Sequence, residues 1–486
     1  MKTLNSILQQ TTFECVQGSL TTEINCLTFD SRKAVSGSVF IAIVGTNTDG
    51  HQFVQSAYDL GCRNFVVEQA ISLASDATII RVPKTDVALA EIACAFYDNP
   101  SKELKLVGIT GTNGKTTSTT LLHDLFSQLG HACGLISTVV NKIKNEASPA
   151  THTTPDPIRL NELLRSMVDH GCTHCFMEVS SHAIHQQRIH GITFAGAVFT
   201  NITHDHLDYH KTFAEYIRVK KQFFDELNQD AFALVNGDDR NAQVMLQNSK
   251  AQKRSYALKT PADFKGKVLE NEISGLIMTI NNTELCSRLV GEFNAYNLLA
   301  VYGVSTMLGL ESLDVLRGIS NLASVEGRFQ YIRSQTGITA IIDYAHTPDA
   351  LDNVLNTIAA IRKDTQKVIA IVGCGGDRDR DKRPVMAQIA AKKSQQVILT
   401  SDNPRTEDPM KILQDMENGL TQDDRQHTLT ISDRAQAIKT AIMLAQPGDI
   451  LLIAGKGHEK YQEINGVKHD FDDFKLTEEF FNQLKK

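Results

Sequence analysis

Short apolar segments of strand length alternate with segments of helical pattern along nearly the whole chain, and this alternation restricts the folds that the chain can adopt. Among the first hundred residues, the patterns predict strands over residues 39–44 and 64–67 and helices over residues 51–60 and 86–97. Repeated strand–helix units place their strands mainly in parallel sheets, with helices packed on both faces. The alternation therefore predicts an α/β protein.

The alternation breaks twice, which divides the 486 residues into three expected domains, over residues 1–100, 101–331 and 332–486. A prior of ~150 residues per domain also gives three. An Asn-Pro turn at residues 98–101 closes the first unit, and the second ends near Arg328. In the second and third domains we expect strands over residues 104–110, 175–179, 195–200, 231–235, 339–343, 368–373, 397–400 and 450–454, and helices over residues 115–129, 294–308, 312–323, 348–362, 384–393, 409–420 and 434–445.

The charge balance excludes some classes of partner. The chain has 49 Lys and Arg against 56 Asp and Glu, a net charge of −7, whereas nucleic-acid coats and polybasic membrane binders carry excess positive charge. The longest apolar runs have strand length, far short of the ~20 residues of a spanning helix, and the first ten residues lack the apolar core of a signal peptide. Nine scattered cysteines indicate free thiols in a reducing compartment. We expect a cytoplasmic protein with no nucleic-acid, membrane or obligate protein partner.

The strongest local signal is a glycine-rich segment between a predicted strand and a predicted helix, Thr110-Gly-Thr-Asn-Gly-Lys-Thr-Thr117. In such a loop, backbone N–H groups and the helix N-terminus surround phosphate oxygens, Lys115 adds positive charge, and the hydroxyl of Thr116 can reach Mg²⁺. The strict pattern requires glycine at position 109, where the chain has Ile109, so this is a variant phosphate loop. The alternative is a strand–helix turn that binds nothing.

A second glycine cluster, Gly373-Cys-Gly-Gly-Asp-Arg378, does not fit the dinucleotide-binding fingerprint, whose last glycine would fall on Arg378. Charged residues fill positions 378–383. They form either a solvated loop or, because they follow a predicted strand, part of a ligand site.

Glu178 and His206 each follow a predicted strand, where parallel strand ends surround a bound phosphate, so both are candidate Mg²⁺ ligands. Imidazole is an uncommon ligand for this hard cation. The His and Asp residues of positions 204–210 also fit a metallohydrolase site with a borderline ion such as Zn²⁺, or a polar loop with structural histidines. Cys172 and Cys175 have zinc-like spacing but no second cysteine pair. Because Cys175 also starts an apolar segment, we expect it to be a buried thiol.

Six segments occur in the order found in one enzyme family: residues 110–117, 178–182, 205–208, 294–297, 326–328 and 343–346. Together they resemble the motifs of the Mur ligase family of peptidoglycan synthesis, over nearly the whole chain. Two further segments, Asp402-Asn-Pro-Arg405 and Gly455-Lys-Gly-His-Glu459, resemble the branch that adds meso-diaminopimelate. This amino acid has a distal carboxylate that lysine lacks, which the planar guanidinium of Arg405 would suit, and Glu459 would suit the distal ammonium. In isolation, the Asn-Pro pair is also compatible with a turn before a helix, which is the weaker alternative.

The resemblance implies an ATP-dependent amide ligase with Mg²⁺ as cofactor. Such an enzyme phosphorylates the D-glutamyl γ-carboxylate of UDP-N-acetylmuramoyl-L-alanyl-D-glutamate (UDP-MurNAc-L-Ala-D-Glu), and the amine of meso-diaminopimelate then attacks the acyl phosphate. The alternatives are an L-lysine-adding member of the family, a folylpolyglutamate synthase-like ligase, and a phosphate-loop switch or transport ATPase. The implied architecture is α/β with a UDP-sugar-binding N-terminal domain, a central P-loop-type catalytic domain with a mainly parallel sheet, and a Rossmann-like C-terminal domain that binds the amino acid.

The resemblance also implies roles for individual residues. The catalytic residues would be Lys115, Glu178, His206 and Lys220, and the metal ligands Thr116, Glu178, His206 and Lys220. The ATP site would comprise Gly111, Thr112, Asn113, Gly114, Lys115, Thr116, Thr117, Asn294, Asn297, Arg328, Asp343 and His346. The UDP-sugar dipeptide site would comprise Phe29, Ser31, Thr46, Asn47, Thr48, His152, Thr153, Thr154, Ser180, Gln186 and Arg188. The diaminopimelate site would comprise Arg378, Asp402, Asn403, Pro404, Arg405, Gly455 and Glu459.

The family carries a carbamylated lysine where this chain has Lys220, and carbamylation (N6-carboxylysine) would turn a cation into an oxygen ligand for a second Mg²⁺. Without the resemblance, Lys220 would be taken as a helix-surface lysine beside Lys221. The family commonly has asparagine where this chain has His152, and leucine where it has Phe29.

Overall fold

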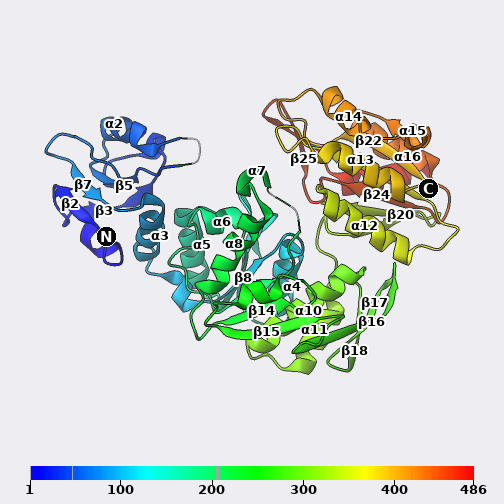
Figure 1. Ribbon diagram of the computed structural model, residues 1–486, viewed down its shortest axis with the longest axis horizontal. Helices are drawn as coiled ribbons and strands as arrows, with labels where there is room; N and C mark the ends of the chain where they lie inside the picture. The colour runs from blue at the N-terminus through cyan, green and yellow to red at the C-terminus, as the bar shows by residue number, and fades with distance from the viewer. Residues whose placement is uncertain (1, 46–47, 204, 206) are drawn as a thin grey trace.

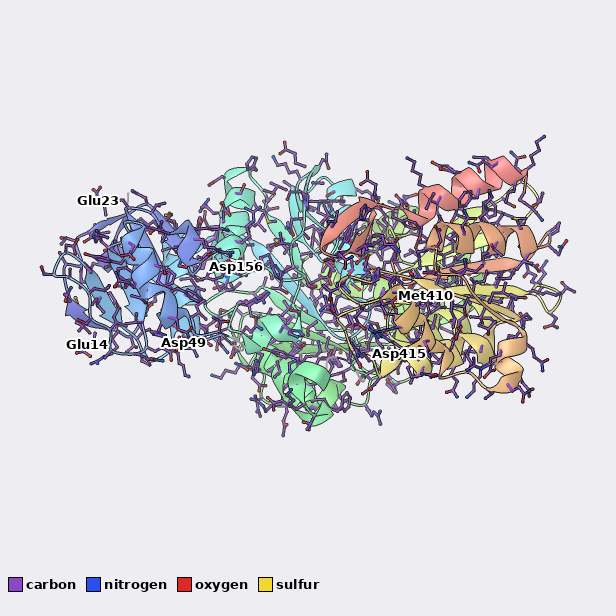
Figure 2. All side chains as sticks on the ribbon, turned by 90° about the horizontal axis from the view of Figure 1, so that it is seen from above. Glu14, Glu23, Asp49, Asp156, Met410 and Asp415 are labelled. Carbon is purple, nitrogen blue, oxygen red and sulfur yellow. The ribbon has the colours of Figure 1, made fainter. Side chains whose placement is uncertain are left out.

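The structure is a computed structural model that describes residues 2–45, 48–203, 205 and 207–486. Three α/β domains follow one another in chain order, from blue through green to yellow and red (Figure 1). Seen from above, they lie along the long axis of the molecule, with Glu14 and Glu23 at the outer end of the N-terminal domain and Asp49 on its side toward the central domain (Figure 2). In the described part of the chain, no helix has the length and apolar character needed to cross a membrane.

The N-terminal domain is built on a five-stranded sheet in the order β2-β7-β6-β5-β4, in which β2 is antiparallel and the other pairs are parallel. Successive side chains of β5 point to opposite faces, so that Val39 packs with α1 and α3, and Phe40 packs with α2. The elements are β1 (Lys2–Thr3), α1 (Leu4–Ile7), β2 (Glu14–Gln17), β3 (Glu23–Ile24), β4 (Cys26–Thr28), β5 (Ser38–Ile41), α2 (Val54–Asp59), β6 (Asn64–Val67), β7 (Thr78–Arg81) and α3 (Thr85–Phe96).

The central domain contains an eleven-stranded sheet in the order β11-β10-β9-β12-β8-β13-β14-β15-β16-β17-β18. The seven strands from β9 to β16 pair in parallel, and antiparallel strands extend the sheet at both ends. The strands are β8 (Lys105–Thr110), β9 (Cys133–Ile136), β10 (Val140–Ile143), β11 (Glu146–Pro149), β12 (His174–Glu178), β13 (Gly196–Phe199), β14 (Phe232–Asn236), β15 (Gln252–Ala257), β16 (Phe264–Glu272), β17 (Gly275–Ile280) and β18 (Thr283–Ser287).

Helices cover both faces of this sheet. The helices are α4 (Lys115–Gln128), α5 (Pro157–Asp169), α6 (Ser181–His185), α7 (Leu207–His210), α8 (Phe213–Asp225), α9 (Ala242–Leu246), α10 (Glu292–Met307) and α11 (Ser312–Asn321). Leu121 of α4 and Leu298 of α10 belong to the core on one face, and Leu164 of α5 and Val219 of α8 to the core on the other. Helix α5 also packs against α3, which joins the N-terminal and central domains.

The C-terminal domain has a six-stranded sheet in the order β19-β20-β24-β21-β22-β23, parallel except for β19. Helices α12, α13 and α14 pack on one face, and α16 and α17 on the other. The elements are β19 (Gln330–Arg333), β20 (Thr339–Asp343), α12 (Pro348–Ile361), β21 (Val368–Cys374), α13 (Lys382–Lys393), β22 (Gln396–Ser401), α14 (Pro409–Glu417), α15 (Gln422–Gln426), β23 (Thr428–Thr430), α16 (Arg434–Leu444), β24 (Ile450–Ala454), β25 (Tyr461–Ile464), β26 (Val467–Asp470) and α17 (Asp473–Leu484).

The three-domain α/β class that the sequence predicts is confirmed, and the expected parallel strands form with ends within a few residues of those predicted. The nine cysteines are free thiols, Cys175 is buried as expected, and Cys172 is buried as well. The sequence patterns do not predict the antiparallel strands β16 to β18. Those strands alternate buried and exposed residues, because antiparallel strands with one solvated face lack the continuous apolar runs of buried parallel strands.

Candidate active site

A cleft of about 1160 Å³ opens between the central and C-terminal domains. Residues at or just after the carboxyl ends of parallel strands border it in both domains: Gly111 and Glu178 in the central domain, and Asp343, Asp402 and Gly455 in the C-terminal domain. Ligands of open α/β sheets bind at this edge. The cleft is therefore the candidate active site.

The glycine-rich loop between β8 and α4 has the geometry of a phosphate loop. Gly114 precedes α4 in the left-handed conformation, with φ of +87°. A Cβ atom on Gly111 would lie 1.9 Å from the hydroxyl oxygen of Thr200, so the close approach requires glycine. The Thr200 hydroxyl donates to the carbonyl oxygen of Asn113 (2.6 Å), and the N–H of Asn113 donates to the side-chain oxygen of Asn201 (2.9 Å). The segment after β13 thus holds the loop in shape.

Two lysine side chains meet beneath this loop. The ammonium of Lys115 donates to the carbonyl oxygen of Gly111 (2.8 Å). Lys220 is 1% exposed, so it is not a helix-surface residue, and its Nζ donates to the hydroxyl of Thr110 (3.2 Å) and to Gly111 (3.1 Å). Burial, together with the nearby charge of Lys115, lowers the pKa of Lys220 well below its usual value. A lysine in this setting has an increased fraction of neutral amine.

Glu178, at the end of β12, is fully buried, and its carboxylate is oriented by Thr138. The N–H of Thr138 donates to one carboxylate oxygen (2.7 Å) and its hydroxyl to the other (3.2 Å). The hydroxyl of Thr153 lies 3.1 Å from that of Thr138, and the hydroxyl of Thr154 donates to the backbone carbonyl of Glu178 (2.8 Å). The carboxylate is therefore fixed at the border of the cleft.

Further hydrogen bonds connect Thr154 to other predicted residues of the dipeptide site. The N–H of Ser180 donates to the Thr154 hydroxyl (3.1 Å), and Arg188 donates to the Thr154 carbonyl (2.8 Å). Arg188 also donates to the side-chain oxygen of Gln186 (2.6 Å). His152 is exposed and does not border the cleft. The structure thus brings Thr154, Ser180, Gln186 and Arg188 together.

The C-terminal domain reaches the phosphate loop through Asp349, in the first turn of α12. One carboxylate oxygen of Asp349 accepts hydrogen bonds from the side-chain amide of Asn113 (2.8 Å) and from the hydroxyl of Thr203 (3.0 Å). From the segment that joins the two domains, the guanidinium of Arg328 donates to the hydroxyl of Thr116 (3.2 Å). The loop is therefore contacted from outside its own domain.

Ionisable groups at the end of β20 and just after it are enclosed where the two domains meet. Asp343 accepts a hydrogen bond from the N–H of Phe329 (2.7 Å), and burial raises its pKa to about 6. Burial lowers the pKa of His346 to about 4, with the positive charge of Lys382 acting in the same direction. His346 is therefore uncharged at neutral pH.

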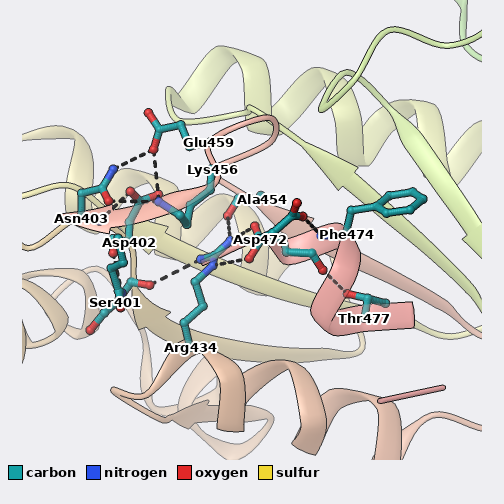
Figure 3. Close-up of polar contacts among 12 residues, drawn as sticks. Ser401, Asp402, Asn403, Arg434, Ala454, Lys456, Glu459, Asp472, Phe474 and Thr477 are labelled. Carbon is teal, nitrogen blue, oxygen red and sulfur yellow. Dashed lines mark hydrogen bonds and ion pairs between the residues drawn. The ribbon is translucent and has the colours of Figure 1, made fainter. Parts of the chain in front are cut away.

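A second polar cluster lies in the C-terminal domain where β22 and β24 end (Figure 3). The amide of Asn403 donates to the carboxylate of Glu459 (2.7 Å), and the buried ammonium of Lys456 donates to Asn403 (3.0 Å) and to Glu459 (3.2 Å). A Cβ atom on Gly455 would lie 2.5 Å from a carboxylate oxygen of Asp402, so this approach also requires glycine. Glu459 is therefore held in place by neighbouring side chains.

Arg434, which Figure 3 shows below this cluster, forms a fully buried ion pair with Asp473. The guanidinium of Arg434 donates to both carboxylate oxygens of Asp473, at 2.8 and 2.7 Å, and to the carbonyl oxygen of Ala454 (3.1 Å). These contacts tie α16 and α17 to the end of β24. They fix the strand end from which Gly455 and Glu459 follow.

Arg405 lies beside this cluster, in a left-handed conformation with φ of +51°. Its Nη1 donates to the carbonyl oxygen of Gly376 (2.8 Å). A Cβ atom on Gly376 would lie 2.0 Å from the carbonyl oxygen of Pro404, which shows how closely the loops after β21 and β22 approach. The second glycine cluster of the sequence thus supports the Arg405 segment.

The cleft brings most of the predicted residues of the described chain together. Those that border it are Gly111, Thr112, Asn113, Gly114, Lys115, Thr116, Thr117, Thr153, Glu178, Ser180, Lys220, Asn297, Arg328, Asp343, His346, Arg378, Asp402, Asn403, Arg405, Gly455 and Glu459. The predicted residues of the described chain that do not border it are Phe29, Ser31, Thr48, His152, Thr154, Gln186, Arg188, Asn294 and Pro404. Thr46, Asn47 and His206 lie outside the described residues.

Sequence reasoning missed Asp349, Lys456 and Thr138. Asp349 follows the 343–346 segment in the same strand–helix connection, and Lys456 lies within the 455–459 segment, so position alone could have suggested both. Thr138 stands between two strands with no motif around it, and no signal in the sequence distinguishes it.

The fold and the cleft define a class: a three-domain α/β protein in which a phosphate-type loop of one domain faces a polar pocket of the next. The chain matches the catalytic domain of the Mur ligase family over residues 23–97, the Mur ligase middle domain over residues 109–305 and the Mur ligase glutamate ligase domain over residues 327–457. The chain belongs to the Mur ligase family.

Individual relatives agree with this assignment. A relative from Phocaeicola vulgatus named UDP-N-acetylmuramoyl-L-alanyl-D-glutamate--2,6-diaminopimelate ligase is 51% identical, covering 98% of this chain and 99% of its own. A solved structure with the same name is 32% identical with a TM-score of 0.71, covering 100% and 99% of the two chains. A Mycobacterium tuberculosis folylpolyglutamate synthase complexed with ADP and AMPPCP has a TM-score of 0.62, is 18% identical, and covers 76% of this chain and 93% of its own. This last likeness is one of fold.

Proposed function

We propose that the protein is an ATP-dependent amide ligase of peptidoglycan biosynthesis that joins meso-diaminopimelate to the D-glutamate of UDP-MurNAc-L-Ala-D-Glu. The observation that carries this proposal is that the phosphate loop and the Arg405 pocket open onto one cleft from two domains. The name of the Phocaeicola vulgatus relative, 51% identical over nearly the full length, supports the choice of substrates.

The chemistry requires two steps. A carboxylate does not acylate an amine directly, because oxide is a poor leaving group. Transfer of the γ-phosphoryl group of ATP to the D-glutamyl γ-carboxylate gives an acyl phosphate and ADP. Attack by the amine of diaminopimelate then forms the amide bond and releases inorganic phosphate and a proton. Phosphoryl transfer depends on positioning and charge neutralisation more than on covalent help from the protein.

The phosphate loop would position ATP. The N-terminus of α4 and the backbone N–H groups from Gly111 to Lys115 offer donors for phosphate oxygens. In the described chain, Nε of Arg328 is buried without a hydrogen-bond partner, and an unsatisfied buried donor of this kind suits an anionic ligand. The structurally similar folylpolyglutamate synthase was solved in complex with ADP and AMPPCP, which supports a nucleotide as the ligand.

The oxygen-bearing side chains beside this loop fit a bound Mg²⁺. The hydroxyl of Thr116 and the carboxylate of Glu178 are hard oxygen donors that border the same cleft, and Mg²⁺ typically binds through one or two protein groups plus water and phosphate oxygens. When bound, Mg²⁺ neutralises phosphate charge. We retain His206 as a further candidate ligand.

We also propose that Lys220 is carbamylated. Only a neutral amine adds CO₂, and the lowered pKa of the buried Lys220 favours that form. The carbamate would provide oxygen ligands for a second Mg²⁺. Incubation with ¹³C-labelled bicarbonate should give a carbamate carbon signal in NMR spectra of the wild type that is absent from Lys220→Arg. Equal signals from the two proteins would contradict the proposal.

The UDP-sugar dipeptide would extend from the phosphate loop toward the N-terminal domain. We propose that Thr153, Thr154, Ser180, Gln186 and Arg188 hold the muramoyl dipeptide, because their hydrogen bonds connect them to the strand end at Glu178. The uridine end would then reach Phe29, Ser31 and the segment from Thr46 to Thr48. Asp49, which follows that segment, lies on the side of the N-terminal domain toward the central domain (Figure 2).

One assay tests the reaction. Purified protein is supplied with ATP, Mg²⁺ and UDP-MurNAc-L-Ala-D-Glu, and phosphate release is measured with meso-diaminopimelate, with L-lysine or with no amine. We expect release that depends on the dipeptide and on meso-diaminopimelate. Release without any amine would favour an ATPase, preference for L-lysine would favour the lysine-adding branch, and activity only with a folate substrate would favour a folylpolyglutamate synthase.

Arg405→Ala tests the amino-acid pocket. Because Arg405 would bind the distal carboxylate through charged hydrogen bonds, we expect kcat/KM for meso-diaminopimelate to fall about a hundredfold, with the KM for ATP little changed. Arg425→Ala is a matched control, since Arg425 is an exposed residue of α15 in the same domain. A large loss of ATP affinity in Arg405→Ala would contradict this role.

A further inference from the structure

The carboxylate of Glu463 faces the guanidinium of Arg405 from strand β25. An oxygen of Glu463 lies 3.5 Å from Nε of Arg405, and the two side chains are 26% and 21% exposed. The two residues are also joined through their backbones, because the N–H of Arg405 donates to the carbonyl oxygen of Glu463 (3.0 Å) and the N–H of Asn465 donates to the carbonyl oxygen of Arg405 (2.7 Å). The hairpin of β25 and β26 therefore holds the two side chains next to each other.

The guanidinium has one edge left for a ligand. Nη1 of Arg405 donates to Gly376, and in the part of the chain that the structure describes Nη2 donates no hydrogen bond. A carboxylate binds arginine best through two parallel N–H groups. The Nε–Nη2 edge is therefore the edge at which a carboxylate can bind through two hydrogen bonds. Glu463 occupies only the Nε end of this edge, through its single contact of 3.5 Å.

We propose that Glu463 is the internal counter-ion of Arg405, and that the distal carboxylate of the amino-acid substrate takes its place at the Nε–Nη2 edge. This inference rests on the proposed function, since it assumes that Arg405 receives that carboxylate. An unpaired, largely buried guanidinium is unfavourable, and Glu463 relieves this cost while the pocket is empty. A substrate with a distal carboxylate exchanges one loose ion pair for two direct hydrogen bonds.

Because of this exchange, Glu463 lowers the affinity for the substrate, whereas an ordinary binding residue raises it. Every binding event must break the Arg405–Glu463 contact, which weakens the net interaction with the substrate. Removal of the charge of Glu463 should therefore strengthen binding of meso-diaminopimelate. L-lysine, which has no distal carboxylate, leaves the pair intact and should gain nothing from its removal.

The test compares Glu463→Gln with the wild type in the ligase assay at saturating ATP and UDP-MurNAc-L-Ala-D-Glu. We expect the KM for meso-diaminopimelate to fall about three- to fivefold, the range of a partly exposed ion pair, with kcat and the KM for ATP unchanged and L-lysine used no better. Asp470→Asn is the control, because Asp470 is an exposed acidic residue on the other strand of the same hairpin. It should leave the KM for meso-diaminopimelate unchanged.

A double variant separates counter-ion exchange from a structural role. In an Arg405→Ala background the gain from Glu463→Gln should disappear, because the two side chains act through one contact. If Glu463→Gln does not fold, Glu463→Asp, which keeps the charge but shortens the side chain, should give a smaller decrease in KM. If the wild type uses meso-diaminopimelate but a folded Glu463 variant has an unchanged or raised KM for it, the inference is overturned. If the wild type itself does not use meso-diaminopimelate, the proposed function fails instead, and this inference fails with it.

Discussion

Asp343 ends strand β20 with its carboxyl group enclosed where the two larger domains meet. Burial raises its pKa from 3.8 to about 6, and this outweighs the opposing effects of the Arg328 charge and of the hydrogen bond from the N–H of Phe329. The folded protein therefore favours the protonated form more than the unfolded chain does. Because the pKa of Asp343 is higher in the folded protein than in the unfolded chain, its contribution to the stability of the fold is fully present below the pKa of the unfolded chain. This contribution is lost as the pH rises through about 6.

Asp343→Asn should reveal this loss. The asparagine cannot ionise and can still accept the hydrogen bond from Phe329, so the stability of the variant relative to the wild type should increase by about 1 kcal/mol between pH 5 and pH 7.5. Urea unfolding at the two pH values measures the difference. Asp352→Asn, at a partly exposed position on α12 where the carboxylate pairs with Lys393, serves as the control. A difference between variant and wild type that does not change with pH would contradict the burial of an ionisable carboxyl group.

Single residues could be predicted from the sequence where they stand at the end of a strand. Glu178 was identifiable in this way, because parallel strand ends converge at one edge of a sheet, whereas Asp343 was identified by the resemblance of its segment to a family motif. Asn294 belongs to a recognised segment, yet its side chain donates to the carbonyl oxygen of Val290 (2.8 Å) and does not border the cleft. Asp349 acts across a domain junction, and a single sequence does not show which surfaces meet there.

At the scale of elements, the loop between β8 and α4 depends on the segment that follows β13. Thr200 and Asn201 hold the backbone of Asn113 in place, and they approach so closely that the loop has no room for a side chain at position 111. The geometry of the phosphate loop is therefore a joint property of two strand ends.

Gly111→Ala should disrupt this arrangement. The new Cβ atom would lie 1.9 Å from the Thr200 hydroxyl oxygen, so the loop must shift. We expect the affinity for ADP to fall at least about tenfold, because the loss of one charge-assisted hydrogen bond can account for that factor. Calorimetric titration with ADP measures the effect. Gly130→Ala is the matched control, because Gly130 also has a positive φ, of +87°, but a Cβ atom there meets nothing within 4 Å. It should cost about 1–2 kcal/mol in stability and leave ADP binding unchanged. Wild-type affinity in Gly111→Ala would show that the loop adapts.

Elements were predictable to the extent that their residues are buried on both faces. β20 and β24 have five buried residues each, and the apolar runs of residues 339–343 and 450–454 predict them without error. β16 is nine residues long with charged side chains along one side. Its apolar residues are too sparse to form the continuous run by which the parallel strands were recognised.

At the scale of the whole molecule, a net charge of −7 would not favour the binding of polyanionic substrates. Among the described residues that border the cleft, acidic side chains outnumber Lys and Arg side chains ten to six. Attraction of such substrates would therefore depend on the placement of individual cations, such as Lys115, Arg328, Arg378 and Arg405, and not on a positively charged lining. The acidic side chain of Asp349 also stands at this cleft, where it receives hydrogen bonds from Asn113 and Thr203. It connects the C-terminal domain to the phosphate loop at the point where nucleotide would bind.

Asp349→Ala should loosen the contact between the two domains. Its carboxylate is the shared acceptor of hydrogen bonds from the central domain, at 2.8 Å from Asn113 and 3.0 Å from Thr203, so its removal takes away both at once. We expect a larger radius of gyration in small-angle X-ray scattering and a KM for ATP raised about three- to tenfold, in line with the loss of two hydrogen bonds that each contribute about 0.5–1.5 kcal/mol.

Asp352→Ala controls for the loss of one negative charge on α12. Asp352 pairs with Lys393 within the C-terminal domain (2.5 Å), so its replacement should change neither the scattering nor the KM for ATP. If Asp349→Ala behaves like Asp352→Ala, these hydrogen bonds do not hold the two domains together. Their relative position must then depend on the connecting segment around Arg328 and on the packing of α12 against the central domain. If Asp349→Ala alone expands the molecule, the contact between Asp349 and the phosphate loop holds the C-terminal domain in position. The carboxylate of Asp349 then couples nucleotide binding to the position of that domain.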